Sequence, residues 1–156
     1  MHFTPKTFAF LRALKRHNDR VWFADHKDRY VADVEAPMVQ FITDFAPRLR
    51  KISRAYVADP RRRGGSMFRI YRDTRFSADK KPFKTWAAAR FSHEAKKQLE
   101  SVPEFYLHVG DDECYGGGGV YHLDMPALTK IRHAIVDAPK AWAAVRKTGI
   151  EIEGDT

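Results

Sequence analysis

The stretch FRIYRDTRFSADKKPFKT, residues 68–85, threads apolar and aromatic side chains between charged ones. Eight of its eighteen residues are charged. A solvated run of charges does not need Phe68 or Ile70, and a buried strand does not ordinarily accept Arg69 and Asp73. The stretch is therefore predicted to border the core, with an apolar face on one side and a polar face on the other.

Residue parity extends this prediction to a sheet. A strand is predicted over Met67–Arg72, with Phe68 and Ile70 facing the core and the intervening arginine and tyrosine facing away. A second strand is predicted over Phe105–Val109, with Tyr106 and His108 on its polar face, and a third begins near Glu113. If the first two strands share a sheet, one of its faces gathers guanidinium, carboxylate, phenol and imidazole groups.

Helix signals dominate the first third of the chain and reappear near its end. Thr4-Pro5 and Asp19 are typical of helix starts, and Pro37 and Met125-Pro126 begin further helices. Residues 86–100 are ambiguous: we expect a strand over residues 86–91 and leave the rest open between strand and helix. The predicted fold is α+β, a small, mainly antiparallel sheet with the N-terminal helices and a C-terminal helix packed on it.

Length and composition indicate one globular domain. The chain has 156 residues, 44% of them hydrophobic, and we expect a single domain over residues 1–156. Its single cysteine, Cys114, excludes an internal disulfide framework. No apolar run approaches the roughly 18 residues of a membrane span, and the N-terminus lacks the pattern of a signal peptide. A cytoplasmic protein with no membrane partner is expected.

Positive charge is concentrated in one segment. The formal net charge is +8, but residues 48–90 alone carry fourteen Lys and Arg against three Asp, whereas the remaining residues carry an excess of acidic groups. Such a field favours phosphates, carboxylates or nucleic acid as partners. The alternative is a solvated basic surface without a specific partner.

A pocket for a small anionic ligand, bearing phosphate or carboxylate, is the first functional hypothesis. One carboxylate, Asp73, cannot neutralise the nearby arginines and lysines, so the surplus charge is free to hold an anion. The alternative is structural: Asp73 bridges two of the arginines and closes the loop. The predicted basic ligand-binding residues are Arg69, Arg72, Arg75, Lys80 and Lys84.

Weaker candidates complete the predicted site. Gly117 and Gly118 would let backbone amides approach a ligand, although a glycine-rich bulge or turn is the alternative for residues 116–119. Asp73, Tyr106 and His108 are candidates for proton exchange if a reaction occurs, but no reaction is assigned. The histidines lack metal-binding spacing, so no metal and no cofactor are expected. The loop containing Arg61-Arg62-Arg63 is interpreted as a surface feature.

Two other classes of function remain open. The basic segment 48–90 could form a nucleic-acid-binding module, with Tyr56, Tyr71 or Phe83 stacking on bases. Alternatively, the chain is a non-catalytic structural or interaction domain.

Four motifs carry a family resemblance: RIYRDTRFSADKKPFKT at residues 69–85, NDRVWF at 18–23, PEFYLHV at 103–109 and GGGG at 116–119. Together they resemble the uncharacterised family called domain of unknown function 2461, over roughly residues 3–145. The resemblance implies an intracellular α+β protein without an established activity. It suggests as signature residues Arg69, Arg72, Asp73, Arg75, Asp79, Lys80, Pro82 and Lys84.

The chain departs from this family pattern at two places. Family members are expected to continue some tens of residues beyond Thr156, so a C-terminal family segment is expected to be missing, together with any part of the site that it carries. Cys114 occupies a position where the family is not expected to carry cysteine, which argues against a role for its thiol.

Overall fold

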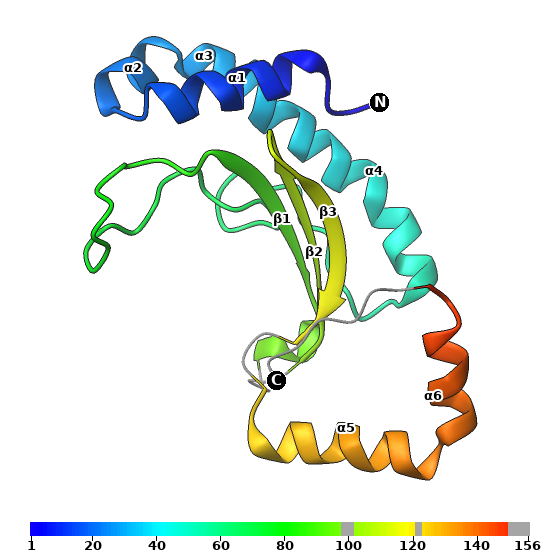
Figure 1. Cartoon of the computed structure of the whole chain (residues 1–156). Coiled ribbons are helices and arrows are strands. Elements are labelled where there is room, and N and C mark those ends of the chain that lie inside the picture. The colour runs from blue at the N-terminus through cyan, green and yellow to red at the C-terminus, as the bar shows by residue number, and fades with distance from the viewer. Residues whose placement is uncertain (98–101, 121–122, 150–156) are drawn as a thin grey trace. The chain divides into compact units, whose positions relative to one another are not determined.

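The computed structural model describes residues 1–97, 102–120 and 123–149 (Figure 1). The chain separates into two compact units, Met1–Val120 and Tyr121–Thr156. A single domain over residues 1–156 stays a prediction.

Three antiparallel strands form the sheet of the first unit, in the order β1-β2-β3. They are β1 (Trp86–Ser92), β2 (Glu104–Gly110) and β3 (Cys114–Gly119). The strands predicted at residues 86–91, 105–109 and beyond residue 113 are confirmed, as is the α+β class. The open part of residues 86–100 contains a short 3-10 turn, Glu94–Lys97, and residues 98–100 lie outside the described residues.

Helices fill the N-terminal part of this unit: α1 (Pro5–Arg16), α2 (Arg20–Asp25), α3 (Lys27–Tyr30) and α4 (Ala36–Ile52). The Asp19 side chain caps α2 by accepting a hydrogen bond from the Trp22 amide (2.8 Å). A π-helical turn, Val31–Glu35, precedes α4. Pro37 explains this wider winding, because proline lacks an amide hydrogen and its ring crowds the carbonyl four residues earlier.

The core lies between α4 and one face of the sheet, and α1 closes it from the side (Figure 1). Phe91 of β1 packs against Phe45 of α4 with ring centroids 5.0 Å apart. On β2, Val109 is buried in this core and Phe105 and Leu107 pack against it, so the predicted parity of the strand is confirmed. Tyr106 and His108 consequently lie on the opposite face of the sheet.

The predicted strand Met67–Arg72 is an extended segment with two isolated bridges, Met67↔Ala89 and Tyr71↔Phe83. It follows the outer edge of β1 only briefly, where the Phe68 amide donates a hydrogen bond to the Ala88 carbonyl (2.9 Å). Met67 and Ile70 are buried, whereas Phe68 lies on the polar face near Tyr106. The predicted parity is wrong at Phe68 because the chain leaves the sheet between residues 68 and 70.

Residues 71–83 then form a hairpin that we call the finger, which projects beside the sheet (Figure 1). Two backbone hydrogen bonds hold its base. The Arg72 amide donates to the Pro82 carbonyl (2.9 Å), and the Lys84 amide donates to the Ile70 carbonyl (2.8 Å). Asn18 fixes the base to the α1–α2 junction, because its side-chain amide exchanges two 3.0 Å hydrogen bonds with the backbone of Phe83.

The second unit contains α5 (Met125–Asp137), which begins where predicted, and α6 (Pro139–Arg146). Asp124 caps α5 by accepting from the Ala127 amide (2.7 Å). Packing of a C-terminal helix on the sheet stays a prediction. Across the described ranges, no helix is both long enough and apolar enough to cross a bilayer.

Truncating Phe91 tests the position of the core. Phe91 is fully enclosed, so Phe91→Ala should lower the free energy of unfolding by about 3–5 kcal/mol in a urea titration. Phe76→Ala is the matched control, since Phe76 is 96% exposed and its loss should change stability by no more than about 0.5 kcal/mol. Equal effects of the two substitutions would contradict the assigned core.

Candidate functional site: a basic groove

A groove of about 570 Å³ lies between the helical residues 23–35 and the extended segment 62–71. We call it the basic groove, because its rim carries five cationic side chains and one carboxylate. Buried Phe23, Tyr30 and Ile70 contribute to its lining. Its charged residues are Lys27, Glu35, Arg62, Arg63, Arg69 and Arg90.

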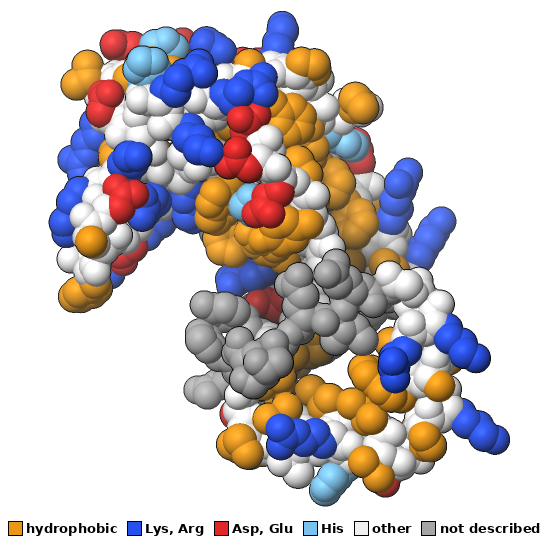
Figure 2. Space-filling view, viewed as in Figure 1, with side chains coloured by type: hydrophobic (Ala, Val, Ile, Leu, Met, Phe, Trp, Pro, Cys, Tyr) orange, Lys and Arg blue, Asp and Glu red, His pale blue; other side chains and the backbone are white. Residues whose placement is uncertain are grey.

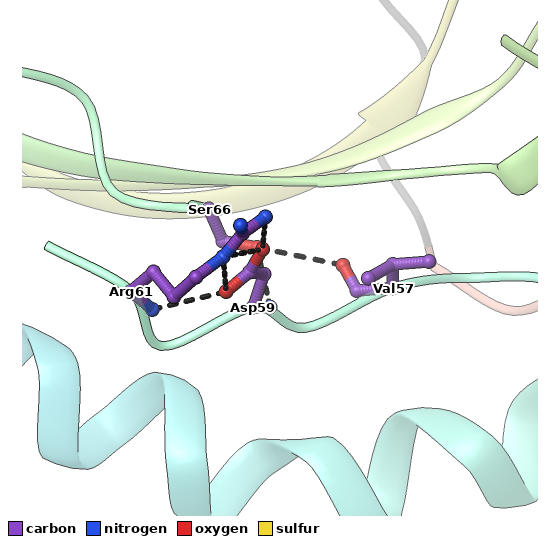
Figure 3. A network of polar contacts seen from close by, with 4 residues as sticks. All are labelled: Val57, Asp59, Arg61 and Ser66. Carbon is purple, nitrogen blue, oxygen red and sulfur yellow. Dashed lines mark hydrogen bonds and ion pairs between the residues drawn. The ribbon is translucent and has the colours of Figure 1, made fainter. Parts of the chain in front are cut away.

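The loop that carries two of these arginines is closed by its own hydrogen bonds (Figure 3). Asp59 accepts from the Arg61 amide (3.0 Å) and pairs with its guanidinium at 2.5 Å. Two hydrogen bonds join the ends of the loop. The Ser66 amide donates to the Asp59 carbonyl (2.8 Å), and the Asp59 amide donates to the Ser66 hydroxyl (2.9 Å). Arg62 and Arg63 therefore stand on a closed turn.

Two glycines permit this closure. Gly64 has φ +72°, the left-handed region that side chains disfavour. A Cβ at Gly65 would lie 2.2 Å from the Arg61 carbonyl oxygen, so any side chain would force the loop open. The Gly64-Gly65 pair is thus required by two different constraints, a dihedral angle and a close backbone approach.

Most cations of the basic groove lack a carboxylate partner. Glu35 pairs with Arg62 across the groove (3.2 Å), and Arg90 lies 3.5 Å from Glu104. Lys27, Arg63 and Arg69 form no ion pair with any residue that the structure describes. The groove therefore holds positive charge that the described residues do not neutralise.

Tyr30 adds a neutral donor to this charged rim. Its ring packs among Phe10 and Phe23 (centroids 6.0 and 5.3 Å), and its hydroxyl has no hydrogen-bond partner in the described ranges. Because no fully buried side-chain N or O atom there lacks a partner, this hydroxyl keeps contact with solvent. Burial raises the pKa of the Tyr30 phenol and the Glu35 carboxylate adds to the effect, so the group remains a protonated donor.

The structure divides the predicted ligand-binding residues among three places. Only Arg69 lines the basic groove. Arg72 and Lys84 line a second groove, of about 520 Å³, which shares no lining residue with the basic groove. Arg75 and Lys80 lie on the finger and line neither groove.

Carboxylates on the finger are matched one to one with arginines. Arg72 pairs with Asp79 (2.6 Å) and Arg75 pairs with Asp73 (2.7 Å). Hydrogen bonds from Arg75 lower the pKa of Asp73 to about 2. Within the part of the chain that is described, Asp73 bridges only this one arginine and is exposed, so the interpretation of Asp73 as a link between two arginines is wrong.

Lys84 lies near two aromatic rings and forms no ion pair with a described carboxylate. Its Nζ is 5.2 Å from the ring centroid of Phe68 and 5.0 Å from that of Trp86, and it donates to the Arg69 carbonyl (3.0 Å). Burial lowers the pKa of Lys84, and the neighbouring Arg69 guanidinium lowers it further. The two cations therefore lie close enough to repel each other electrostatically, and both add to the positive potential of this segment.

Tyr106 and His108 form a separate cluster on the outer face of the sheet. The Tyr106 hydroxyl lies 3.3 Å from His108 Nδ1, and His108 stacks on Tyr115 (centroids 4.9 Å). Burial lowers the pKa of His108 and raises that of Tyr106 to about 12. Neither residue lines the basic groove.

Gly117 and Gly118 lie in regular strand β3, so the alternative of a bulge or turn at residues 116–119 is wrong. A Cβ at Gly118 would approach the Phe105 ring to 3.0 Å, whereas one at Gly117 would meet nothing within 4 Å. Neither glycine lines the basic groove. In the described ranges, no group of three His, Cys, Asp or Glu gathers closely enough to hold a metal ion.

The sequence interpretation missed Lys27, Tyr30, Arg62 and Arg63 as groove residues. A signal for the two arginines was present, because Asp59 two positions before Arg61 and the pair Gly64-Gly65 are typical of an ordered turn. No comparable signal marks Lys27 or Tyr30, which reach the groove from helical positions.

The model of the family DUF2461, described as a conserved hypothetical protein, matches residues 6–154. The chain belongs to this family. Comparisons with curated proteins and with solved structures found no match.

Substitution of the two loop glycines tests the closed turn. Gly64→Ala adds a side chain in open space at positive φ and should lower the free energy of unfolding by about 1–2 kcal/mol. Gly65→Ala also collides with the Arg61 carbonyl and should cost more. Urea unfolding of both variants makes the comparison, and a smaller effect at Gly65 would contradict the geometry of the loop.

His108 makes stability depend on pH. Because its pKa is lowered in the folded protein, the unfolded chain binds this proton more readily. The free energy of unfolding should therefore fall as pH drops below about 6.5, until the lowered folded-state pKa is reached. His108→Gln should flatten this fall between about pH 7 and 5 in urea titrations. His133→Gln, at an exposed position of α5, is the control and should keep the native profile.

Proposed function

We propose that the basic groove binds a small anionic ligand carrying a phosphate or carboxylate group. One observation carries the proposal: three cations around the groove have no carboxylate partner in the described chain, and the groove's single acidic residue is already paired with Arg62. Unpaired cations around a concave site favour binding of an anion from solution. The proposal concerns binding, and no reaction is assigned.

The lining suggests how such a ligand would be held. Arg63 and Arg69 offer planar guanidinium groups that can donate two parallel hydrogen bonds to one phosphate or carboxylate. Tyr30 supplies a neutral hydroxyl donor, and Phe23 and Ile70 offer apolar contact for the rest of the ligand. A volume of about 570 Å³ lies within the range usual for small-molecule sites.

A cytoplasmic location stays an expectation from the sequence.

The nucleic-acid alternative loses part of its predicted stacking set. Phe83 is 2% exposed and lies against Phe23 (centroids 4.1 Å), so it cannot stack on a base. Tyr56 is half-buried between His93 and Phe105. Of the three predicted groups, only Tyr71 is broadly exposed.

Arg69→Gln tests the proposed site. A library of phosphorylated and carboxylated metabolites would first be screened by thermal shift, where a ligand at about 100 times its dissociation constant adds about 2.7 kcal/mol of stability. For any ligand found, Arg69→Gln should weaken binding about 10- to 150-fold, because a charge-assisted hydrogen bond contributes about 1.5–3 kcal/mol.

Arg75→Gln is the matched control, since it removes the same charge from the finger, outside the groove. It should leave the affinity within about twofold of the native value, as expected for a distant exposed charge at physiological ionic strength. A ligand whose affinity depends on Arg75 and not on Arg69 would refute the assignment to the basic groove.

A further inference from the structure

The finger presents an apolar ring to solvent on an ordered scaffold. Phe76 at its tip is 96% exposed, whereas the hydrogen bonds at its base hold the two arms together. Nearer the tip, the Lys80 ammonium donates to the Thr74 carbonyl (3.0 Å), and the Lys81 amide donates to Asp79 (3.0 Å). A phenylalanine fixed outside the core on such a scaffold is suited to an intermolecular contact.

One arginine lies near this ring, and two lysines follow on the same hairpin. Residues 72–81 carry four basic side chains and two carboxylates, and both carboxylates are already paired with arginines. The Arg75 guanidinium lies 5.8 Å from the centroid of the Phe76 ring. Figure 2 shows Lys and Arg side chains along the finger, with hydrophobic side chains at its end. Within the described chain, Lys80 and Lys81 therefore carry the unpaired positive charge of the finger, on the same hairpin as the exposed Phe76 ring.

A second exposed aromatic residue links the finger to the basic groove. Tyr71 at the finger base is 53% exposed and also lines the groove beside Arg69. Cations and exposed rings thus alternate from the groove through Tyr71 to Phe76. Proteins that bind single-stranded nucleic acid use this combination, with cations following the backbone and rings stacking on bases.

We propose that the finger and the adjoining rim of the basic groove bind single-stranded nucleic acid, with Phe76 and Tyr71 stacking on bases. Lys80 and Lys81, which form no ion pair with a described carboxylate, would contact phosphates. This interaction goes beyond the small-ligand site and does not require it, because Phe76 lies outside the groove.

Other occupants of the tip fit the charges less well. An anionic membrane surface would contact the finger at its tip and would not use Tyr71 at its base. A second copy of this chain carries the same net charge of +8 and would be repelled. Duplex nucleic acid keeps its bases stacked and offers none to Phe76.

Fluorescence anisotropy with a labelled mixed-sequence single-stranded oligonucleotide tests the proposal on the full chain. Phe76→Ala should weaken binding about 5- to 150-fold, the equivalent of losing one stacked base. The salt dependence should stay unchanged, because no charge is removed. Val21→Ala, at an exposed position of α2, is the control and should bind as the native protein does.

The lysines give the complementary result. The double substitution Lys80→Gln with Lys81→Gln should make the slope of log affinity against log salt shallower by about 0.7 for each phosphate that is no longer neutralised. The same oligonucleotide annealed to its complement should bind more weakly than the single strand. Vesicles of equal parts phosphatidylcholine and phosphatidylserine should show no binding that depends on Phe76.

Three results would overturn the proposal: no binding at low salt, binding that Phe76→Ala leaves unchanged, or a preference for duplex or vesicles that depends on Phe76. Because Phe76 is exposed, its substitution should not affect folding, and the melting temperature of each variant confirms this. Failure here leaves the small-anion proposal standing, since that one is tested by Arg69→Gln with isolated metabolites.

Discussion

Two backbone hydrogen bonds hold residues 66–68 against the outer edge of β1, and the groove and the finger both depend on them. The Phe68 amide donates to the Ala88 carbonyl (2.9 Å) and the Arg90 amide donates to the Ser66 carbonyl (2.8 Å). This short contact lies between the loop that carries Arg62 and Arg63 and the finger. Because the pairing stops after residue 68, Arg69 leaves the sheet and reaches the groove.

The distribution of carboxylates decides where positive charge remains. Asp59, Asp73 and Asp79 each pair with an arginine of their own turn or hairpin, and Glu35 pairs with Arg62. These exposed or half-exposed pairs contribute little to stability individually. They shape the loop and the finger, and they leave Lys27, Arg63 and Arg69 at the basic groove without an ion-pair partner among the described residues.

Local patterns predicted the regular elements well. Helix caps at Thr4 and Asp19 and the apolar alternation of residues 105–109 depend on neighbours in sequence, so the sequence alone identifies them. The segment after Met67 was predicted less well, because Asn18 and β1 decide where it leaves the sheet. Asn18 lies 65 residues from its partner Phe83, a separation that no local pattern reports.

The same reasoning explains the outcome for the candidate site. Sequence charge predicted a basic surface around residues 48–90, but it could not divide the cations between two grooves and a finger. Arg69 was predicted from its own neighbourhood, whereas Lys27 and Tyr30 come from helices whose contact with segment 62–71 is tertiary. The resemblance at residues 69–85 identified the family correctly and carried no information about the ligand.

The central claim is that unneutralised cations make the basic groove an anion site. Crystals grown with selenate would test it directly, because anomalous scattering from selenium locates the bound ion without reference to the protein density. We expect a selenate in the basic groove, contacting Arg69 together with Arg63 or Lys27. Selenate ordered only in the second groove or on the finger, with none in the basic groove, would contradict it.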